Sequence, residues 1–244
     1  MKIRVINPNT TAAMTANIGE AARAVAAPGT QIDAVQPSFG APSIEGHHDD
    51  VWAAAGVAEQ VRAGEAAGVD AHVIACFGDP GLHAARELAR GPVIGIAEAA
   101  FHAASLLATG FSVVTTLTRT VVIAEHLVLQ YGFERRCRGI HGTDIAVLEL
   151  DDPASDAYAR ILACSREALL RDRSGAIVLG CAGMADLCRR LQGELGVPVI
   201  DGVATAVKLA EGLVSLGLGT SKRGDYAAPL SKTYVGLAGP YSPA

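Results

Sequence analysis

Short apolar runs alternate with longer segments in which apolar residues recur every three or four positions along almost the whole chain. The short runs are rich in valine and isoleucine and predict strands, whereas the longer segments predict amphipathic helices. The predicted strands cover residues 2–6, 31–36, 71–75, 92–95, 112–115, 137–141, 175–179 and 198–200. The predicted helices cover about residues 10–26, 51–67, 82–90, 97–110, 119–131, 153–171, 185–194 and 203–217, and an irregular tail follows. This alternation predicts an α/β fold.

The pattern occurs twice. One β-branched run ends in Cys76 and another in Cys181, and in both cases a glycine follows two residues later and a helix begins soon afterwards. The tripeptide Pro-Val-Ile follows each of these helices, at Pro92 and at Pro198. The cysteines are 105 positions apart and the prolines 106. Matching order and spacing predict two copies of one α/β unit.

We therefore predict two pseudo-twofold-related lobes, each with a parallel four-stranded sheet flanked by helices. Residues 1–96 and 218–244 are assigned to the first lobe and residues 97–217 to the second, with helices that cross at the lobe junctions. Ligands of such sheets bind beyond the carboxyl ends of the strands. The two cysteine turns are therefore expected to face each other across one cleft.

Polar side chains follow the first strand of each predicted unit. Asn7, Asn9 and Thr10 follow the first strand of the chain, and Thr115 and Thr116 occupy the equivalent positions in the second unit. Asn9 or Thr10 is also a good N-cap for the next helix, so capping and ligand binding are equally good interpretations of any single residue. For the group as a whole, its position at the cleft favours substrate binding.

Three further segments mark a loop and two helix starts. Residues 37–46 are too rich in proline and glycine to be regular, and a loop of this length beyond a strand end is a candidate substrate wall or lid. The run at residues 47–50, His-His-Asp-Asp, looks like a metal cluster, but adjacent helical residues face different ways and no third spaced ligand follows. A helix N-terminus, whose dipole favours the aspartates, is the better interpretation. Asp152-Pro153 marks another helix start.

Composition excludes several classes of function. The chain has 244 residues, of which 50% are hydrophobic, enough for a core in each of two lobes. Its net charge is −5 and it contains no block of Lys or Arg, so we expect no nucleic-acid partner. No signal-like segment and no membrane-length apolar run is present, and we expect a cytoplasmic protein without a membrane partner. Five cysteines, an odd number, fit reduced thiols.

The duplicated cysteines are the candidate catalytic residues. Each ends a strand just before a helix, whose positive end is expected to lower the thiol pKa toward neutrality. A single such cysteine is more often a small buried hydrophobe, and we expect this for Cys164 and Cys188. For the duplicated pair, a purely structural role would require two inert cysteines to stand at equivalent positions by coincidence. Two opposed thiols suit proton exchange at a stereocentre: one thiolate removes a hydrogen, and the opposite thiol returns one to the other face.

Other thiol chemistries fit the pattern less well. A disulfide oxidoreductase has its cysteines close together as C-x-x-C, and a thiol hydrolase pairs one cysteine with a histidine. Backbone amides at Phe77, Gly78, Ala182 and Gly183 are candidates for holding an enolate oxygen. Asp79 adjoins the first turn, and its side chain is expected to cap a helix. No lysine context of the pyridoxal type and no dinucleotide glycine motif occurs, so no cofactor is expected.

These residues resemble the hydantoin racemases and allantoin racemases within the aspartate/glutamate racemase superfamily. The resemblance covers nearly the whole chain, through residues 5–11, 43–46, 75–81 and 179–184. It implies an aspartate/glutamate racemase-like fold and cofactor-independent racemisation at C5 of a 5-substituted hydantoin, a neutral cyclic ureide, with Cys76 and Cys181 as the two acid/base residues. It also implies that Ser43, Ile44 and Asp79 belong to the substrate site, and that the chain forms a homo-oligomer.

Two alternatives stay open: an amino-acid racemase of the same superfamily, and a non-catalytic binding protein. Amino-acid racemases of this superfamily typically have Asn-Thr and Thr-His after their cysteines, whereas Phe77-Gly78 and Ala182-Gly183 stand here, which favours a neutral ring over aspartate or glutamate. Arylmalonate decarboxylases keep only one catalytic cysteine, and both are present in this chain. The alternative from another class is a two-lobed protein that binds a small molecule and whose cysteines are inert.

Overall fold

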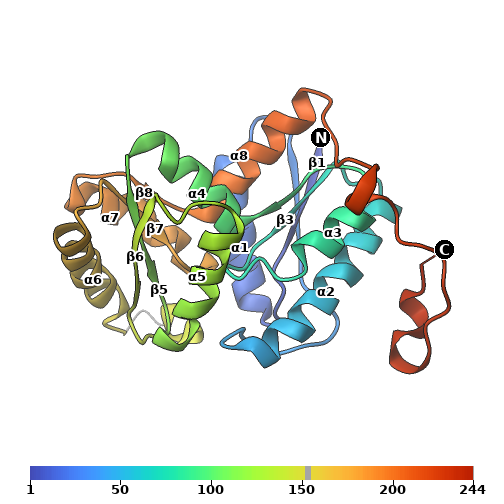
Figure 1. Ribbon diagram of the computed structural model, residues 1–244, viewed down its shortest axis with the longest axis horizontal. Coiled ribbons are helices and arrows are strands. Elements are labelled where there is room, and N and C mark those ends of the chain that lie inside the picture. Colours follow the sequence, from blue (N-terminus) through green and yellow to red (C-terminus); the bar gives the residue numbers. More distant parts are fainter. Residues whose placement is uncertain (152–154, 244) are drawn as a thin grey trace.

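The computed structural model describes residues 1–151 and 155–243. It contains two parallel four-stranded sheets that lie side by side (Figure 1). The first has the order β2-β1-β3-β4 and is built from β1 (Lys2–Ile6), β2 (Gln31–Val35), β3 (Ala71–Ile74) and β4 (Val93–Gly95). The second has the equivalent order β6-β5-β7-β8 and is built from β5 (Phe111–Thr115), β6 (Cys137–Gly142), β7 (Ala176–Leu179) and β8 (Val199–Ile200). The predicted fold class is confirmed.

Helices follow the strands, as the change of period from two to nearly four predicts. They are α1 (Ala12–Val25), α2 (His47–Ala66), α3 (Leu82–Leu88), α4 (Ile96–Leu107), α5 (Val121–Gln130), α6 (Ala157–Asp172), α7 (Cys188–Leu195) and α8 (Gly202–Ser215). Helix α2 begins four residues earlier than predicted and carries Asp49 and Asp50 in its first turn, which confirms the interpretation of this run as a helix N-terminus. The predicted start at Asp152-Pro153 lies outside the described residues.

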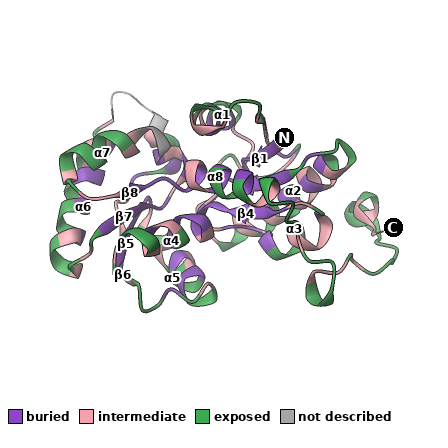
Figure 2. Cartoon of the chain, turned by 90° about the horizontal axis from the view of Figure 1, so that it is seen from above, coloured by how far each residue is buried: buried purple, intermediate pink, exposed green. Residues whose placement is uncertain are grey.

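The strands beside the cleft are buried on both faces because helices cover both sides of each parallel sheet. All residues of β3 and of β7 are buried, and Figure 2 shows the buried positions concentrated in the two sheets. In each unit the strand before the cysteine pairs with the first strand of the unit, in the registers Ile3↔Ala71 and Phe111↔Ala176. Cys76 and Cys181 therefore each stand two residues beyond the end of equivalent central strands.

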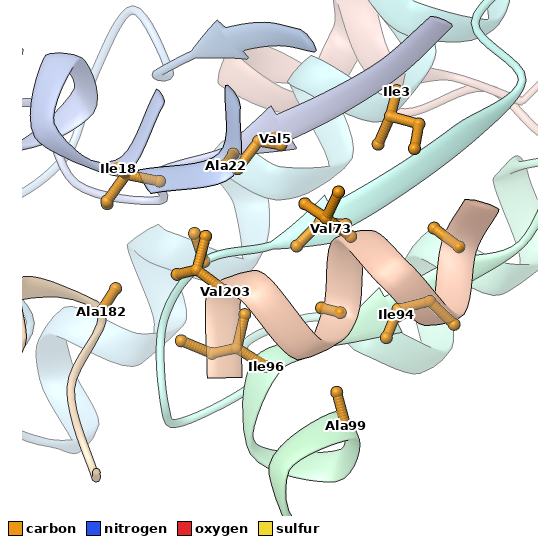
Figure 3. Close-up of a cluster of buried hydrophobic side chains, with 14 of the residues drawn as sticks. Ile3, Val5, Ile18, Ala22, Val73, Ile94, Ile96, Ala99, Ala182 and Val203 are labelled. Atoms are coloured by element: carbon orange, nitrogen blue, oxygen red, sulfur yellow. The ribbon is translucent and has the colours of Figure 1, made fainter. Parts of the chain in front are cut away.

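The chain crosses between the two units through α4 and α8. Helix α4 packs against β7 and β8 of the second sheet, α8 packs against β3 and β4 of the first sheet, and the two helices contact each other. Val203 of α8 shares a core cluster with Val5 and Val73 of the first sheet (Figure 3). The predicted division of the chain places α8 with the second lobe, and the lobe boundaries stay a prediction.

The residues after α8 return to the first unit. Thr220 N–H donates to the carbonyl oxygen of Arg90 at 2.9 Å, and the Lys222 ammonium donates to the carbonyl oxygen of Arg86 at 2.6 Å. Beyond this point the tail extends away from the sheets, and most of its residues are exposed (Figure 1). Within the described residues, no helix combines the length and the apolar character that a membrane span requires.

Candidate active site

One pocket lies between the two units at the carboxyl ends of their strands. It encloses about 660 Å³, including its open mouth, which is within the usual range for small-molecule sites. Cys76 and Cys181 both line it. Besides the cysteines, the predicted residues found in its lining are Asn7, Asn9, Ile44, Phe77, Gly78, Thr115, Thr116 and Ala182.

The amide side chains after β1 form a fixed polar wall. Asn7 is buried, and its Nδ2 donates to Oδ1 of Asn9 at 2.8 Å and to Oγ1 of Thr15 at 2.9 Å. Asn9 in turn accepts from the backbone N–H of Thr11 at 2.9 Å, and Thr11 is the N-cap residue of α1. Because these groups bond one another, both amides are held in place before any ligand binds.

Thr10 serves the neighbouring loop instead of the pocket. Its backbone N–H and its hydroxyl both donate to the carbonyl oxygen of Ala41, at 3.0 and 3.2 Å. The hydroxyl of Thr11 donates to the carbonyl oxygen of Pro42 at 2.7 Å. These bonds fix the loop of residues 37–46 against the start of α1. Ile44 of this loop lines the pocket, whereas Thr10 and Ser43 are not among its lining residues.

In the second unit, Thr115 ties its strand end to the turn that carries Cys181. Its Oγ1 donates to the carbonyl oxygen of Gly180 at 2.9 Å. A Cβ atom at position 180 would stand 2.6 Å from Cβ of Thr115, so only glycine allows this approach. Gly183 is not among the lining residues, but a Cβ atom there would stand 3.7 Å from the Sγ atom of Cys181, so the residue lies beside the thiol.

Burial of the thiol and its surroundings in the turn after β3 together set the pKa of Cys76. The backbone N–H of Gly78 donates to its thiol and lowers its pKa, but burial, followed by the charges of Cys181, Asp50 and Asp79, raises the pKa of Cys76 to about 12. The expectation of a lowered pKa is therefore wrong for this residue. The main reason is burial of the thiol. In addition, α3 begins only at Leu82, so its positive end lies too far from Cys76 to offset the burial, because the effect of a helix terminus fades within one turn.

Asp79 faces away from the pocket and caps a helix. Its carboxylate accepts from the backbone N–H groups of Ala97 at 3.1 Å and Glu98 at 3.0 Å, and from the Tyr131 hydroxyl at 2.9 Å. Burial raises its pKa to about 7. The expectation of helix capping thus holds, although the capped helix is α4 and not the helix that follows the turn. Asp79 is not among the residues that line the pocket.

The second unit caps its equivalent helix differently. Asp201 is itself the N-cap of α8, and its carboxylate accepts from the N–H groups of Val203 and Ala204, both at 3.0 Å. In the first unit the N-cap position is Gly95, where a Cβ atom would stand 2.3 Å from Cγ of Asp79. The two units therefore supply the same cap from two different positions.

Sequence reasoning missed several lining residues. Ile123 and Ala124 of α5, Thr120 and Val147 come from the second unit, and only tertiary packing brings them to the pocket. The remaining missed residues are Met14, Asp50, Ala75 and Gly180. Asp50 matters most because it is a carboxylate. The available signal was its place in an acidic first turn, which the helix dipole accounts for without any ligand.

The pocket lining contains one acidic side chain and, among the described residues, no lysine, arginine or histidine. Within the same part of the chain, no group of three or more His, Cys, Asp or Glu side chains is arranged to hold a metal ion. Within the described residues, none of the five cysteines forms a disulfide. Cys164 and Cys188 pack against the apolar cluster under α6 and α7, in agreement with the expected structural role. The chemistry that this pocket offers is therefore that of two thiols, one carboxylate, hydroxyls and amides.

Comparisons with known proteins agree with this architecture. Residues 3–210 match the family model described as Asp/Glu/Hydantoin racemase. A hydantoin racemase of Rhizobium meliloti is 50% identical over 236 residues, which cover 97% of this chain and 98% of that protein. An allantoin racemase structure from Klebsiella pneumoniae has 59% identity and a TM-score of 0.98, with 100% of both chains covered.

A more distant structure shows the fold alone. An aspartate racemase homologue from Pyrococcus horikoshii OT3 has 15% identity and a TM-score of 0.63, and the match covers 88% of this chain and 99% of that one. The strand order, the paired cysteine turns and the match over most of the sequence lead to one assignment. This chain belongs to the Asp/Glu/Hydantoin racemase family and is an isomerase of the racemase class.

Proposed function

We propose that this protein interconverts the enantiomers of 5-substituted hydantoins, a class that includes allantoin, by proton transfer at C5 with Cys76 and Cys181 as the two acid/base groups. The observation that carries the proposal is that both thiols line one pocket from equivalent strand ends of two equivalent units. The similarity of this chain to a hydantoin racemase and to an allantoin racemase supports the substrate class.

The reaction needs a base on one face of C5 and an acid on the other. The C5 hydrogen is acidic because a ring carbonyl adjoins it, and a thiolate removes it to give an enolate. The opposite thiol then delivers its proton to the other face, which inverts the centre and leaves the two sulfurs with exchanged protonation states. Which cysteine starts as thiolate depends on the enantiomer that is bound.

The electrostatics of the pair support this cycle. Two thiolates in one pocket repel each other, and the charge of Cys181 is among the causes that raise the pKa of Cys76. Repulsion of this kind disfavours the state in which both sulfurs are thiolates, so one member of the pair keeps the proton that it delivers as the acid. The backbone N–H of Gly78 donates to the Cys76 sulfur, so it stabilises the thiolate form of this residue and is occupied before an enolate forms.

The lining also supports a neutral substrate. A free amino acid carries a carboxylate, and the described lining offers it no cationic side chain. Hydroxyl and amide groups, such as those of Asn9 and Thr116, suit the N–H and C=O groups of an uncharged ring. No observation specifically favours an aspartate/glutamate-type racemase or a non-catalytic binding protein, and the following experiment separates both from the proposal.

Optically pure 5-substituted hydantoins, allantoin included, are incubated with the enzyme, and the decay of their circular dichroism is followed. We expect decay with wild type and none above background with Cys76→Ser or Cys181→Ser, because serine is a far weaker acid and base at neutral pH. Calorimetry should show that both variants still bind the substrate. Racemisation of aspartate or glutamate at comparable rates, or binding without any wild-type turnover, would refute the proposal.

A further inference from the structure

The two halves of the pocket differ beside their equivalent glycines. A Cβ atom at position 78 would stand 3.6 Å from Oδ1 of Asp50 and 4.0 Å from Sγ of Cys76. A Cβ atom at position 183 would stand 3.1 Å from Cδ1 of Leu150 and 3.7 Å from Sγ of Cys181. A carboxylate therefore lies beside the first thiol, where the second thiol has an apolar side chain.

The Asp50 carboxylate lies half-buried in the first turn of α2 and lines the pocket. None of the described residues donates a hydrogen bond to it, whereas the carboxylate of its neighbour Asp49 accepts the backbone N–H of Glu45 at 3.0 Å. Burial raises the pKa of Asp50, and the nearby charge of His47 opposes this rise. A half-buried carboxylate without a donor is a ready acceptor for a ligand N–H group.

We propose that Asp50 is the specificity-determining residue of the Cys76 half of the pocket: its carboxylate accepts a ring N–H of the neutral cyclic ureide and repels substrates that carry a carboxylate. This inference rests on the proposed function. Leu150, the side chain at the equivalent place beside Cys181, is apolar and is not among the lining residues, so it offers no acceptor, and both enantiomers place the same ring edge against Asp50. They then differ only in which face of C5 is turned toward each thiol.

The glycine at position 78 fits this role. Any side chain there would fill the space that separates the carboxylate, the thiol and Cγ2 of Ile123, which would stand 3.7 Å from such a Cβ atom. Gly78 has no positive φ angle, so its backbone conformation does not by itself require glycine. The space that it leaves open next to Asp50 and Cys76 is where a ring edge would lie.

The first test combines Asp50→Ala with removal of the substrate N–H. The kcat/KM for racemisation is measured for a 5-substituted hydantoin and for its N1-methyl and N3-methyl derivatives, with wild type and the variant. In wild type we expect one of the two methyl derivatives to lose at least about tenfold. For the parent hydantoin, Asp50→Ala should lower kcat/KM by a similar factor relative to wild type, mainly through a higher KM. For the methyl derivative that wild type disfavours, the same substitution should lower kcat/KM little further. If instead the loss of kcat/KM caused by methylation were as large in Asp50→Ala as in wild type, so that the two effects multiply, the inference would be overturned.

The second test concerns charge. Asp50→Asn keeps the shape of the side chain and removes its charge. The two substrates are a hydantoin with an uncharged carboxamidomethyl group at C5 and the matching carboxymethyl anion. We expect the ratio of their kcat/KM values, which favours the uncharged substrate in wild type, to fall by at least about tenfold in the variant. Asp49→Asn, one residue away and bonded to the loop, is the matched control and should leave this preference unchanged. An unchanged preference in Asp50→Asn, or an equal change in Asp49→Asn, would overturn the inference.

The deciding quantity in each test is a ratio between two substrates on the same protein sample: the parent to its methyl derivative, and the uncharged to the charged hydantoin. A partly unfolded variant alters neither ratio. The outcomes also separate this inference from the proposed function. If wild type racemises no hydantoin, the proposed function fails. If wild type racemises hydantoins and the Asp50 variants reduce turnover of all of them by one common factor, the residue acts only through the thiol or the fold, and the specificity role fails.

Discussion

The helix cap of the first unit should be movable to the position that it has in the second unit. Asp79 caps α4 from the cysteine turn while Gly95 occupies the N-cap position, and Asp201 caps α8 directly from that position. The φ and ψ angles of Gly95 are −81° and 142°, and those of Asp201 are −88° and 124°, so Gly95→Asp meets no backbone strain. We therefore predict that Gly95→Asp rescues Asp79→Ala.

The expected magnitudes follow from the contacts. Asp79→Ala removes the acceptor of two helix N–H groups and of the Tyr131 hydroxyl. A lost cap costs about 1 kcal/mol and a buried unsatisfied donor about 1–3 kcal/mol, so the free energy of unfolding should fall by about 2–4 kcal/mol. Gly95→Asp alone should destabilise by about 2 kcal/mol, because its Cβ would stand 2.3 Å from Cγ of Asp79. The double variant should recover at least about 1 kcal/mol relative to Asp79→Ala.

Urea unfolding followed by far-ultraviolet circular dichroism measures all four proteins. Asp201→Ala is the control, since it removes a cap of the same kind from α8, and Gly95→Asp should not rescue it. A double variant no more stable than Asp79→Ala would contradict this prediction, because the cap would then depend on the turn and not on the presence of a carboxylate near the two N–H groups.

Three further predictions concern catalysis, selectivity and pH. Cys76→Ser and Cys181→Ser should each exchange the C5 hydrogen for solvent deuterium in one enantiomer only, and the preferred enantiomer should differ between the two variants. Nuclear magnetic resonance measures this exchange, and the same preferred enantiomer in both variants would refute the two-base assignment. Ile44→Ala should change the order of preferred C5 substituents in competition assays, whereas Phe39→Ala, outside the pocket lining, should not. The folded pKa of Asp79, about 7, exceeds its usual value of 3.8, so the pH-dependent part of its contribution to stability is fully present below about pH 4 and is lost as the pH rises to about 7. Urea unfolding of wild type and Asp79→Leu across this range checks that sign, and a difference that grows with pH would contradict it.

The fold was predictable because its determinants are local in sequence. The runs before Cys76 and Cys181 show strand periodicity, each is followed by a turn glycine and a helix, and their nearly constant spacing reveals the repeat. The equivalent strand ends then bring the two thiols to one pocket by topology alone.

Features that depend on tertiary packing were not predictable in this way. Asp50 precedes Cys76 by 26 positions and fits an ordinary helix start, so nothing near it in sequence indicates that it lines the pocket. The raised pKa of Cys76 results first from burial, which a sequence pattern does not measure. Asp79 was expected to cap a helix, but that the helix is α4 follows only from the fold of both units.

The packing of α8 on the first sheet has a consequence for the order of folding during synthesis. Val203, Ala206 and Val207 cover a core formed by Ile3 and Val73, about 130–200 positions earlier in the chain. A nascent chain that ends before α8 exposes this apolar face to water, so the half that leaves the ribosome first is completed last. The first half should then reach its native state only after α8 has been made, and until then the unfinished face is a site where chaperones or other nascent chains would bind.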